Sequence, residues 1–398
     1  MNALQKPVTP RDEIRSDPVA GGDNGKNFRF YDNRQKYLMF VNTCSEKWIV
    51  ADRVQRELDN LRPHPPALRF FDAGMGDGTV LARVLRSMHR KFERAPFFIA
   101  GKEISLEDVR LTLDKMPDRF LEHPEMVLAV TNASYAEAPW LTLAKPQAAK
   151  TMVWKEVALK GTTTAEFERQ IIELQAFLAD NWRTKVSETT GSMVPETPAV
   201  LILYREDCRF LLDGIIPRRE TPKADFDLIL ASQPFRLRAN TGFKAGRVLA
   251  PLAKALRPGG RLLGIHSAGS DPGLEIVQKI WPGEDPFLVS RRELLDATRS
   301  ALGELESQYR FDPLSNRQAI FRYEMHTLPD EIDNESASIG TSTLLAAWNA
   351  ATYVAQIDDD RLAKAMGSSG YLDATRAVLR KHGELWFNDE SYIIERLR

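Results

Sequence analysis

Along the middle of the chain, short runs of apolar residues alternate with longer stretches in which apolar residues recur every three or four positions. The runs predict buried strands at 68–71, 97–101, 126–131, 227–231 and 261–266. The periodic stretches predict amphipathic helices at 80–92, 106–116 and 246–256, because a period of 3.6 residues places apolar side chains on one helix face. Strands that alternate with helices predict an α/β fold, a parallel sheet with helices on both faces.

The N-terminal region divides into two parts. Residues 1–27 are polar and rich in proline and glycine, which predicts a flexible tail. From residue 31 to 61 the helical period returns and predicts two helices before the sheet. We therefore expect a helical cap at 28–66 and one large domain at 67–398.

The segment 141–221 interrupts the alternation of strands and helices. It contains a helical pattern at 164–181, a polar loop at 187–198 and a strand pattern at 199–204, which together predict an inserted α+β segment. A lid or a dimer contact is favoured over a separate binding function for this insertion, and a dimer contact would make the protein a homo-oligomer.

After the last parallel strand, the pattern predicts a helix at 291–302, an extended segment at 318–325, and helices at 342–355 and 371–380. We expect the region 340–382 to form a C-terminal helical lid. The alternation and aromatic content of 383–397 predict an edge strand.

The composition of the chain argues against several kinds of partner. A formal net charge of -1 supplies no global basic field, which argues against nucleic acid as a partner. Two separated cysteines exclude a disulfide framework, the six scattered histidines show no metal-ligand spacing, and no apolar run is long enough to span a bilayer. We expect a cytoplasmic protein with no metal and no membrane partner.

A glycine turn with the sequence DAGMGDG follows the first predicted strand at 72–78. Gly74, Gly76 and Gly78 can adopt positive φ and lack the Cβ atoms that would keep a ligand from the backbone. The carboxyl ends of parallel strands are where open α/β sheets bind ligands. An adenosine-bearing ligand is therefore favoured over a turn kept only for packing.

Acidic residues near this turn indicate which ligand it binds. Glu103 follows the second strand, where a carboxylate can accept both ribose hydroxyls. A dinucleotide would use the same acid, but Asp72 and Asp77 bring negative charge to the turn. That charge suits the sulfonium and ammonium groups of S-adenosylmethionine (SAM) better than a pyrophosphate.

Over about 68–267, apart from the insertion, the chain resembles class I SAM-dependent methyltransferases. The resemblance is carried by the glycine turn, Glu103, the strand 227–231 with the following SQPF, and the turn LRPGGRLL at 256–263. It implies a Rossmann-like methyltransferase sheet and SAM as cofactor. The implied cofactor-binding residues are Asp72, Gly74, Gly76, Gly78, Glu103, Asn132, Ser134 and Ser232.

The two ends of the chain resemble the histamine N-methyltransferase family more specifically. YLMFVNTCSEK at 37–47 is similar to that family's N-terminal helix and turn, in which a glutamate binds the substrate amine, and the match falls on Glu46. GELWFNDESYII at 383–394 is similar to its last strand, where Asp389 replaces the family's asparagine. Gln233 matches the family's third polar substrate contact, whereas the insertion has no counterpart there.

The resemblance implies a site suited to an amine. Methyl transfer needs a neutral nitrogen lone pair in line with the methyl group. Glu46 and Asp389 could bind a cationic end or accept a proton, and Gln233 could orient the nucleophile. Tyr37, Phe40 and Phe235 would supply aromatic walls, and His266 would lie near the substrate.

Each of these residues also has a structural interpretation. A glutamate at a helix start such as Glu46 is commonly a cap or a surface charge, and Asp389 could be a turn residue. Tyr37 and Phe40 at helical spacing are commonly core.

The sequence thus predicts a SAM-dependent N-methyltransferase acting on a small amine or an imidazole-type substrate. Two alternatives stay open: a methyltransferase acting on a protein or nucleic acid, and a non-catalytic binding protein. The SQPF turn at 232–235 lacks the first asparagine and second proline of the Asn-Pro-Pro-Tyr turn that amide and adenine N-methyltransferases use, which argues against a macromolecular substrate.

Overall fold

A computed structural model describes residues 34–188, 193–326 and 338–397. The predicted flexible tail at 1–27 lies outside the described residues. The described part begins with two helices, α1 (Arg34–Thr43) and α2 (Glu46–Leu58), as expected for a helical cap.

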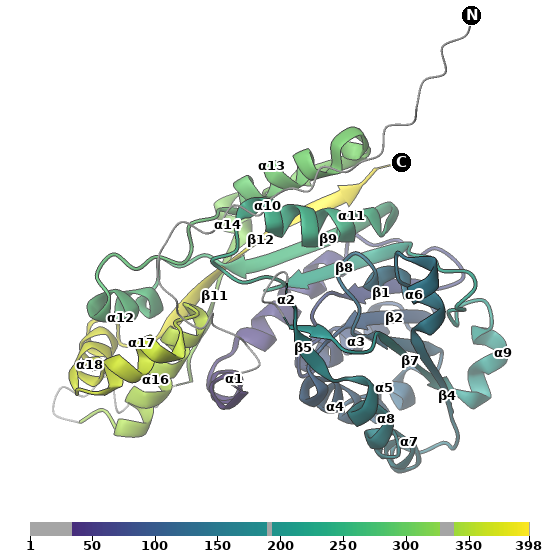
Figure 1. Ribbon diagram of the computed structural model, residues 1–398, viewed down its shortest axis with the longest axis horizontal. Helices are drawn as coiled ribbons and strands as arrows, with labels where there is room; N and C mark the ends of the chain where they lie inside the picture. The colour runs from purple at the N-terminus through teal and green to yellow at the C-terminus, as the bar shows by residue number, and fades with distance from the viewer. Residues whose placement is uncertain (1–33, 189–192, 327–337, 398) are drawn as a thin grey trace, which may run out of the picture.

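The centre of the fold is a ten-stranded sheet, whose strands are drawn as arrows in Figure 1. Its parallel part has the order β9-β8-β1-β2-β3. These strands are β1 (Leu68–Asp72), β2 (Phe97–Lys102), β3 (Met126–Thr131), β8 (Phe226–Ser232) and β9 (Leu256–Ser267). Because β1 pairs with both β2 and β8, the order reverses next to β1, which is where open α/β sheets bind ligands. The predicted Rossmann-like α/β fold is confirmed.

The last strand, β12 (Trp386–Arg396), is not an edge strand as its alternation predicts. It lies between β9 and β10 (Tyr309–Asp312), antiparallel to both, and its first half also pairs with β11 (Ile320–Glu324). The polar residues in the middle of β12 are buried by hydrogen bonds and ion pairs with other side chains. Their alternation with apolar residues therefore does not indicate a solvent-exposed strand.

The segment 141–221 is partly continuous with the main sheet. Its strand β7 (Ala199–Arg205) pairs antiparallel with β3, and β4 (Val153–Leu159) pairs with β7 at the edge of the sheet. The predicted helix at 164–181 is two helices, α7 (Thr164–Ile172) and α8 (Gln175–Asn181). The remaining elements are α6 (Pro146–Thr151), the hairpin β5 (Thr184–Val186) and β6 (Met193–Pro195), and α9 (Arg209–Leu212).

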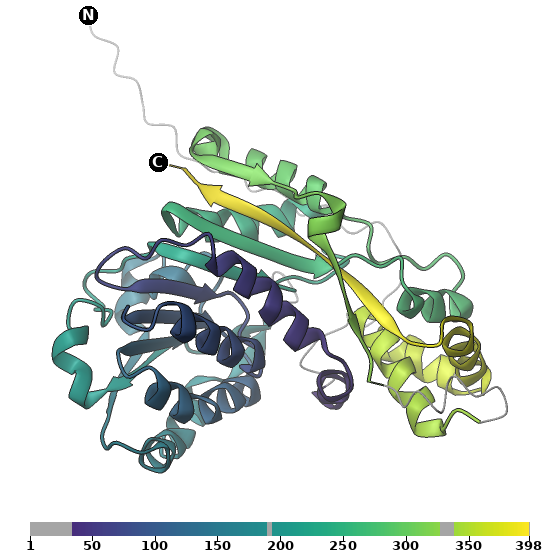
Figure 2. The same ribbon diagram turned by 180° about the vertical axis from the view of Figure 1, so that it is seen from behind.

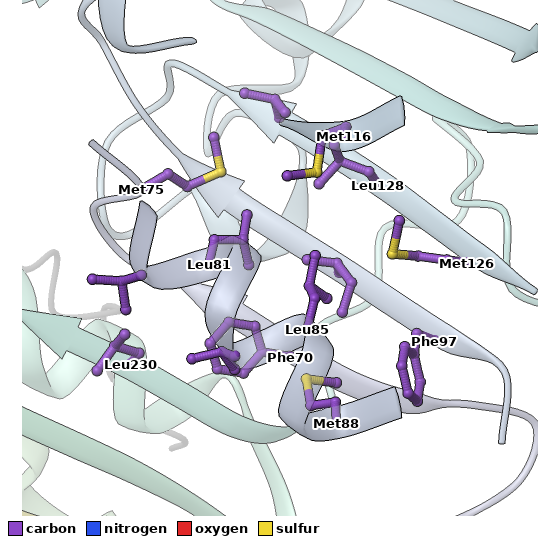
Figure 3. Packing of buried hydrophobic residues seen from close by; sticks show 14 of the residues in the cluster. Phe70, Met75, Leu81, Leu85, Met88, Phe97, Met116, Met126, Leu128 and Leu230 are labelled. Atoms are coloured by element: carbon purple, nitrogen blue, oxygen red, sulfur yellow. The ribbon is translucent and has the colours of Figure 1, made fainter. Parts of the chain in front are cut away.

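Helices cover both faces of the sheet. On one face α2, α3 (Thr79–Lys91), α4 (Leu106–Asp114) and α5 (Met116–Glu122) bury a core that includes Phe70, Met75, Leu81, Phe97 and Met126 (Figure 3). On the opposite face lie α10 (Thr241–Lys244), a π-helical turn at Ala245–Leu249, α11 (Ala250–Lys254) and α13 (Arg291–Leu302). The predicted helix at 291–302 therefore has the predicted bounds.

A group of C-terminal helices forms a third core at one end of β11 and β12 (Figures 1 and 2). It comprises α12 (Pro272–Ile280), α16 (Thr341–Val354), α17 (Asp359–Met366) and α18 (Gly370–His382). Helix α1 belongs to this group, because Lys36 pairs with Asp359 and the Asn349 side chain donates to the Lys36 carbonyl. The cap is thus divided, with α1 on the C-terminal helices and α2 on the sheet.

Candidate active site

The glycine turn joins β1 to α3, and its three glycines have different structural roles. Gly76 and Gly78 have positive φ, 53° and 77°. A Cβ on Gly78 would lie 2.7 Å from the Thr112 Cα, so this glycine serves the close packing of α3 against α4. Gly74 is exposed and a Cβ there would meet nothing within 4 Å. Open space for a ligand therefore lies at Gly74.

Glu103 stands at the end of β2 and is held rigidly beside the turn. Its carboxylate accepts hydrogen bonds from the N–H groups of Gly76 (2.9 Å), Ile104 (2.8 Å) and Ser105 (2.9 Å). Burial, and then the charge of Asp108, raise the pKa of Glu103. Because each carboxylate oxygen can accept more than one hydrogen bond, the fixed carboxylate keeps capacity for ribose hydroxyls.

Two aspartates flank the turn with different protonation tendencies. Burial raises the pKa of Asp72 to about 7, although Gly74 N–H donates to its Oδ1 at 3.1 Å. For Asp77 burial acts in the same upward direction, but hydrogen bonds from Thr79 and the charges of Lys47 and Lys115 lower its pKa overall. The turn therefore presents one firmly ionised carboxylate and one that a cationic ligand would ionise.

Side chains of α1 and α2 lie next to the glycine turn. Tyr37 on α1 donates from its hydroxyl to Asp77 Oδ1 at 3.4 Å. Lys47, in the first turn of α2, places its Nζ 5.6 Å from the Tyr37 ring centroid and 3.1 Å from Glu46 Oε2. Burial opposes the charged form of Lys47, but the carboxylate of Glu46 holds its pKa well above the usual value. Lys47 is not among the site residues that the sequence predicts.

The three residues predicted to be catalytic lie together. Gln233 donates from Nε2 to Ser267 Oγ (3.0 Å) and to Asp389 Oδ1 (3.3 Å). Its backbone has φ 47°, a left-handed conformation that is costly for a non-glycine residue and concentrates at functional sites. Asp389 is fully buried, and burial followed by the charge of Glu46 raises its pKa well above the ordinary value.

Two carboxylate oxygens in this cluster have unused acceptor capacity. Asp389 Oδ2 and Glu46 Oε2 are buried and accept no hydrogen bond from the described part of the chain. Lys47 Nζ lies near Glu46 Oε2 without forming a hydrogen bond to it. A buried acceptor left unsatisfied costs about 1–3 kcal/mol or more when charged, so such atoms indicate an absent donor.

The predicted aromatic and histidine contacts separate into two groups. The Tyr37 ring lies 5.6 Å from Lys47 Nζ, which is next to Glu46, whereas Phe40 has its ring centroid 4.9 Å from that of Tyr353 and belongs to the C-terminal core. His266 and Phe235 do not join the cluster. β9 pairs Ser267 with Asp389, so the adjacent His266 points to the opposite face of the sheet.

On that opposite face His266 lies beside the buried ion pair of Glu390 and Arg291. Its Nε2 lies 2.9 Å from Glu390 Oε1, and Arg291 NH1 lies 2.6 Å from Glu390 Oε2. The Phe235 ring lies 6.4 Å from the His266 ring. The structure thus places His266 on the other face of the sheet from Asp389, and Phe235 lies beside His266.

The remaining predicted cofactor residues follow β3 and β8. Ser232 ends β8, and Ser134 is exposed with its Oγ donating to Glu137 at 2.6 Å. Asn132 is nearly fully committed: its amide donates to the carbonyls of Asn181 (3.1 Å) and Thr197 (2.9 Å), and its oxygen accepts from Ala199 N–H (2.8 Å). Asn132 thus fastens the insertion to the sheet.

Replacing Asn132 by alanine is expected to lower the free energy of unfolding by about 3 kcal/mol, because two part-buried carbonyls and one buried N–H lose their partner. Urea unfolding followed by circular dichroism measures this loss. Ser134→Ala is the matched control and should stay within about 0.5 kcal/mol of wild type, as its hydroxyl is exposed. Equal stability of the Asn132→Ala and Ser134→Ala variants would contradict the fastening role.

Two other side chains near the strand ends, Tyr135 and Lys102, are also not predicted from the sequence. Tyr135 donates from its hydroxyl to the Pro234 carbonyl at 2.7 Å, linking the segments after β3 and β8. Lys102 Nζ lies 4.6 Å from the Tyr135 ring centroid, and burial lowers its pKa. No sequence signal relates these positions, since only the order of the sheet brings them together.

In the part of the chain that the structure describes, no group of three or more histidine, cysteine, aspartate or glutamate side chains could hold a metal ion. Nor does any helix among the described residues have the length and apolar character to cross a membrane.

Among known proteins, similarity to this chain is found only in solved structures. No protein-family model matches the chain, and no curated protein sequence matches it. The chain is similar to the cyclase SpnF, with 14% identity and a TM-score of 0.34, covering 87% of this chain and 81% of that one.

Two further similar structures are methyltransferases. One is described as a sarcosine dimethylglycine methyltransferase from Galdieria sulphuraria (9% identity, TM-score 0.33, covering 94% of this chain and 92% of that one). The other is a geranyl diphosphate methyltransferase solved with GPP and sinefungin (14% identity, TM-score 0.31, covering 85% of this chain and 76% of that one). Matches this distant carry no argument about the reaction, so the function is argued from the geometry of the site.

Proposed function

We propose that this protein is a SAM-dependent methyltransferase that methylates a nitrogen of a small amine. The observation that carries the proposal is the pair of buried carboxylate oxygens without hydrogen-bond donors, Glu46 Oε2 and Asp389 Oδ2. They lie in one cluster with Gln233 and, through Lys47 and Tyr37, reach the glycine turn. A nitrogen with N–H groups is the donor that these oxygens lack.

The glycine turn supports SAM as the methyl donor. Open space at Gly74, a rigid acidic Glu103 and the carboxylates of Asp72 and Asp77 favour a ligand with ribose hydroxyls and positive charge. A pyrophosphate would instead be repelled by these aspartates. Methyl transfer would then occur between this turn and the carboxylates of Glu46 and Asp389.

Burial supports a small substrate over a macromolecular one. Asp389 is 0% exposed and Glu46 5% exposed, and Tyr37 of α1 contacts Asp77 of the turn. A side chain of a folded protein or a nucleic-acid base would have to reach past α1 and α2. A small amine enters such a site without that constraint.

The test is turnover with radiolabelled methyl-SAM and a panel of primary, secondary and heteroaromatic amines. For the best amine, Glu46→Gln is expected to lower kcat/KM by about 30-fold, since a charged hydrogen bond is worth about 2 kcal/mol. Glu168→Gln, an exposed position on α7, is the control and should match wild type. Turnover equal in Glu46→Gln and wild type would rule out Glu46 as the amine-binding group.

A further inference from the structure

The methionine end of SAM carries an ammonium and a carboxylate, and the glycine turn is not equally suited to both. Asp72 and Asp77 flank the turn, so the ammonium would be attracted and the carboxylate repelled. At 4 Å, two unit charges interact by about 4 kcal/mol at the effective dielectric of a protein surface. A SAM site of this kind therefore needs a cation for the carboxylate.

Five backbone N–H groups of the turn already donate within the protein, and an N–H group carries no net charge to balance a carboxylate. Their acceptors are Leu230 O for Ala73, Asp72 Oδ1 for Gly74, Lys102 O for Met75, Glu103 Oε2 for Gly76 and Met75 O for Gly78. A side chain must supply the positive charge.

Two lysines close to the turn have other engagements. Lys115 Nζ donates to the carbonyls of Asp77 (2.7 Å) and Leu111 (3.0 Å), which places it behind the turn against α4. Lys102 Nζ lies over the Tyr135 ring, on the side of the segment after β3. Neither approaches the turn from the cap.

Lys47 does approach it from the cap. Its Nζ lies 5.6 Å from the ring centroid of Tyr37, whose hydroxyl lies 3.4 Å from Asp77 Oδ1 and 3.3 Å from the position a Cβ on Gly76 would take. The side chain is 20% exposed, so the ammonium has room to change partner. A lysine in the first turn of a helix also opposes the helix dipole, which costs about 0.3–1 kcal/mol and calls for a compensating role.

We propose that Lys47 binds the carboxylate of the methionine end of SAM, and this rests on the SAM-dependent function proposed above. In the ligand-free protein Lys47 lies against Glu46 Oε2. On cofactor binding it exchanges that carboxylate for the one on SAM and leaves Glu46 to the substrate amine. The cofactor therefore binds before the amine.

Titration calorimetry with two ligands tests this assignment. S-adenosylhomocysteine carries the carboxylate, and S-adenosyl-3-thiopropylamine is the same molecule without it. Lys47→Met is expected to weaken S-adenosylhomocysteine about 30-fold, the value of one charge-assisted hydrogen bond, and S-adenosyl-3-thiopropylamine less than about 3-fold. Lys47→Arg, which keeps the charge, should recover most of the lost affinity.

The outcomes separate this proposal from the proposed function. Equal losses for both ligands in Lys47→Met, or no loss for either, overturn the role of Lys47 while SAM binding stands. A wild-type protein that binds neither ligand overturns the SAM-dependent function and the Lys47 assignment together. If Lys47→Met does not fold, as judged by its thermal unfolding, Lys47→Gln and Lys47→Arg provide the same comparison.

Discussion

Replacing Gly74 by alanine is expected to weaken the binding of S-adenosylhomocysteine by about 30-fold while leaving the fold intact. Of the three turn glycines, only Gly76 and Gly78 have positive φ, and a Cβ on Gly74 meets nothing within 4 Å. An alanine therefore fits the ligand-free protein without strain. With the cofactor bound, the added methyl group would overlap it, and overpacking of this kind costs about 1–3 kcal/mol. Titration calorimetry measures the affinity and circular dichroism the fold.

Gly78→Ala provides the contrasting control. Its Cβ would lie 2.7 Å from the Thr112 Cα in a left-handed backbone conformation, so this variant should lose stability whether or not a cofactor is present. If Gly74→Ala binds S-adenosylhomocysteine as wild type does, the cofactor does not lie across Gly74. If Gly74→Ala unfolds as Gly78→Ala does, the space at Gly74 is not available for a ligand.

The parallel half of the sheet could be predicted from sequence because its signals are local. The strand at 126–131 and the helix at 291–302 have the predicted bounds, since an apolar run and a capped periodic stretch each specify one element. The glycine turn was found for the same reason. In Ser290 and Glu293 the helix has a capping box, which fixes its start through side chains three residues apart.

Elements that depend on distant pairing were harder to predict. Strand β4 lies at the edge of the sheet, and Lys155 and Glu156 interrupt its apolar residues, so no continuous apolar run marks it in the sequence. The alternation and aromatic content of 383–397 predict an edge strand, but Asp389, Glu390 and Ser391 in the middle of β12 are buried. Those residues are buried by partners on α2, α13 and β8–β9: Ser391 accepts from Arg53, Glu390 pairs with Arg291, and Asp389 accepts from Gln233.

The site was predictable to the extent that its residues share motifs. Glu46, Gln233 and Asp389 lie in three separate regions, and family resemblance brought them to attention before the structure brought them together. The sequence alone does not show that His266 and Asp389 lie on different faces of the sheet, because the register of β9 with β12 determines this. Lys47 had one overlooked signal, a cation in the first turn of a helix whose dipole disfavours it.

Asp389→Asn is expected to lower kcat/KM for the best amine by at least about 100-fold, the usual contribution of a positioned proton acceptor. This carboxyl has one buried oxygen without a donor. Burial and the charge of Glu46 raise its pKa, so wild-type activity should increase with pH as Asp389 ionises. In the asparagine variant that dependence should disappear, which a profile of kcat/KM against pH measures.

The Asp389→Asn replacement should raise the stability of the protein although it lowers the activity. Because the folded-state pKa of Asp389 lies above its unfolded value, the native protein loses stability as pH rises above the unfolded pKa, and an uncharged asparagine removes that loss. The Asp389→Asn variant should therefore have a higher thermal midpoint than wild type at neutral pH, together with lower activity. Asp271→Asn is the matched control: Asp271 caps α12 through the N–H of Leu274, so its replacement should lower the midpoint. An Asp389→Asn variant with unchanged activity and an unchanged pH profile would show that this carboxyl neither accepts the proton nor binds the amine.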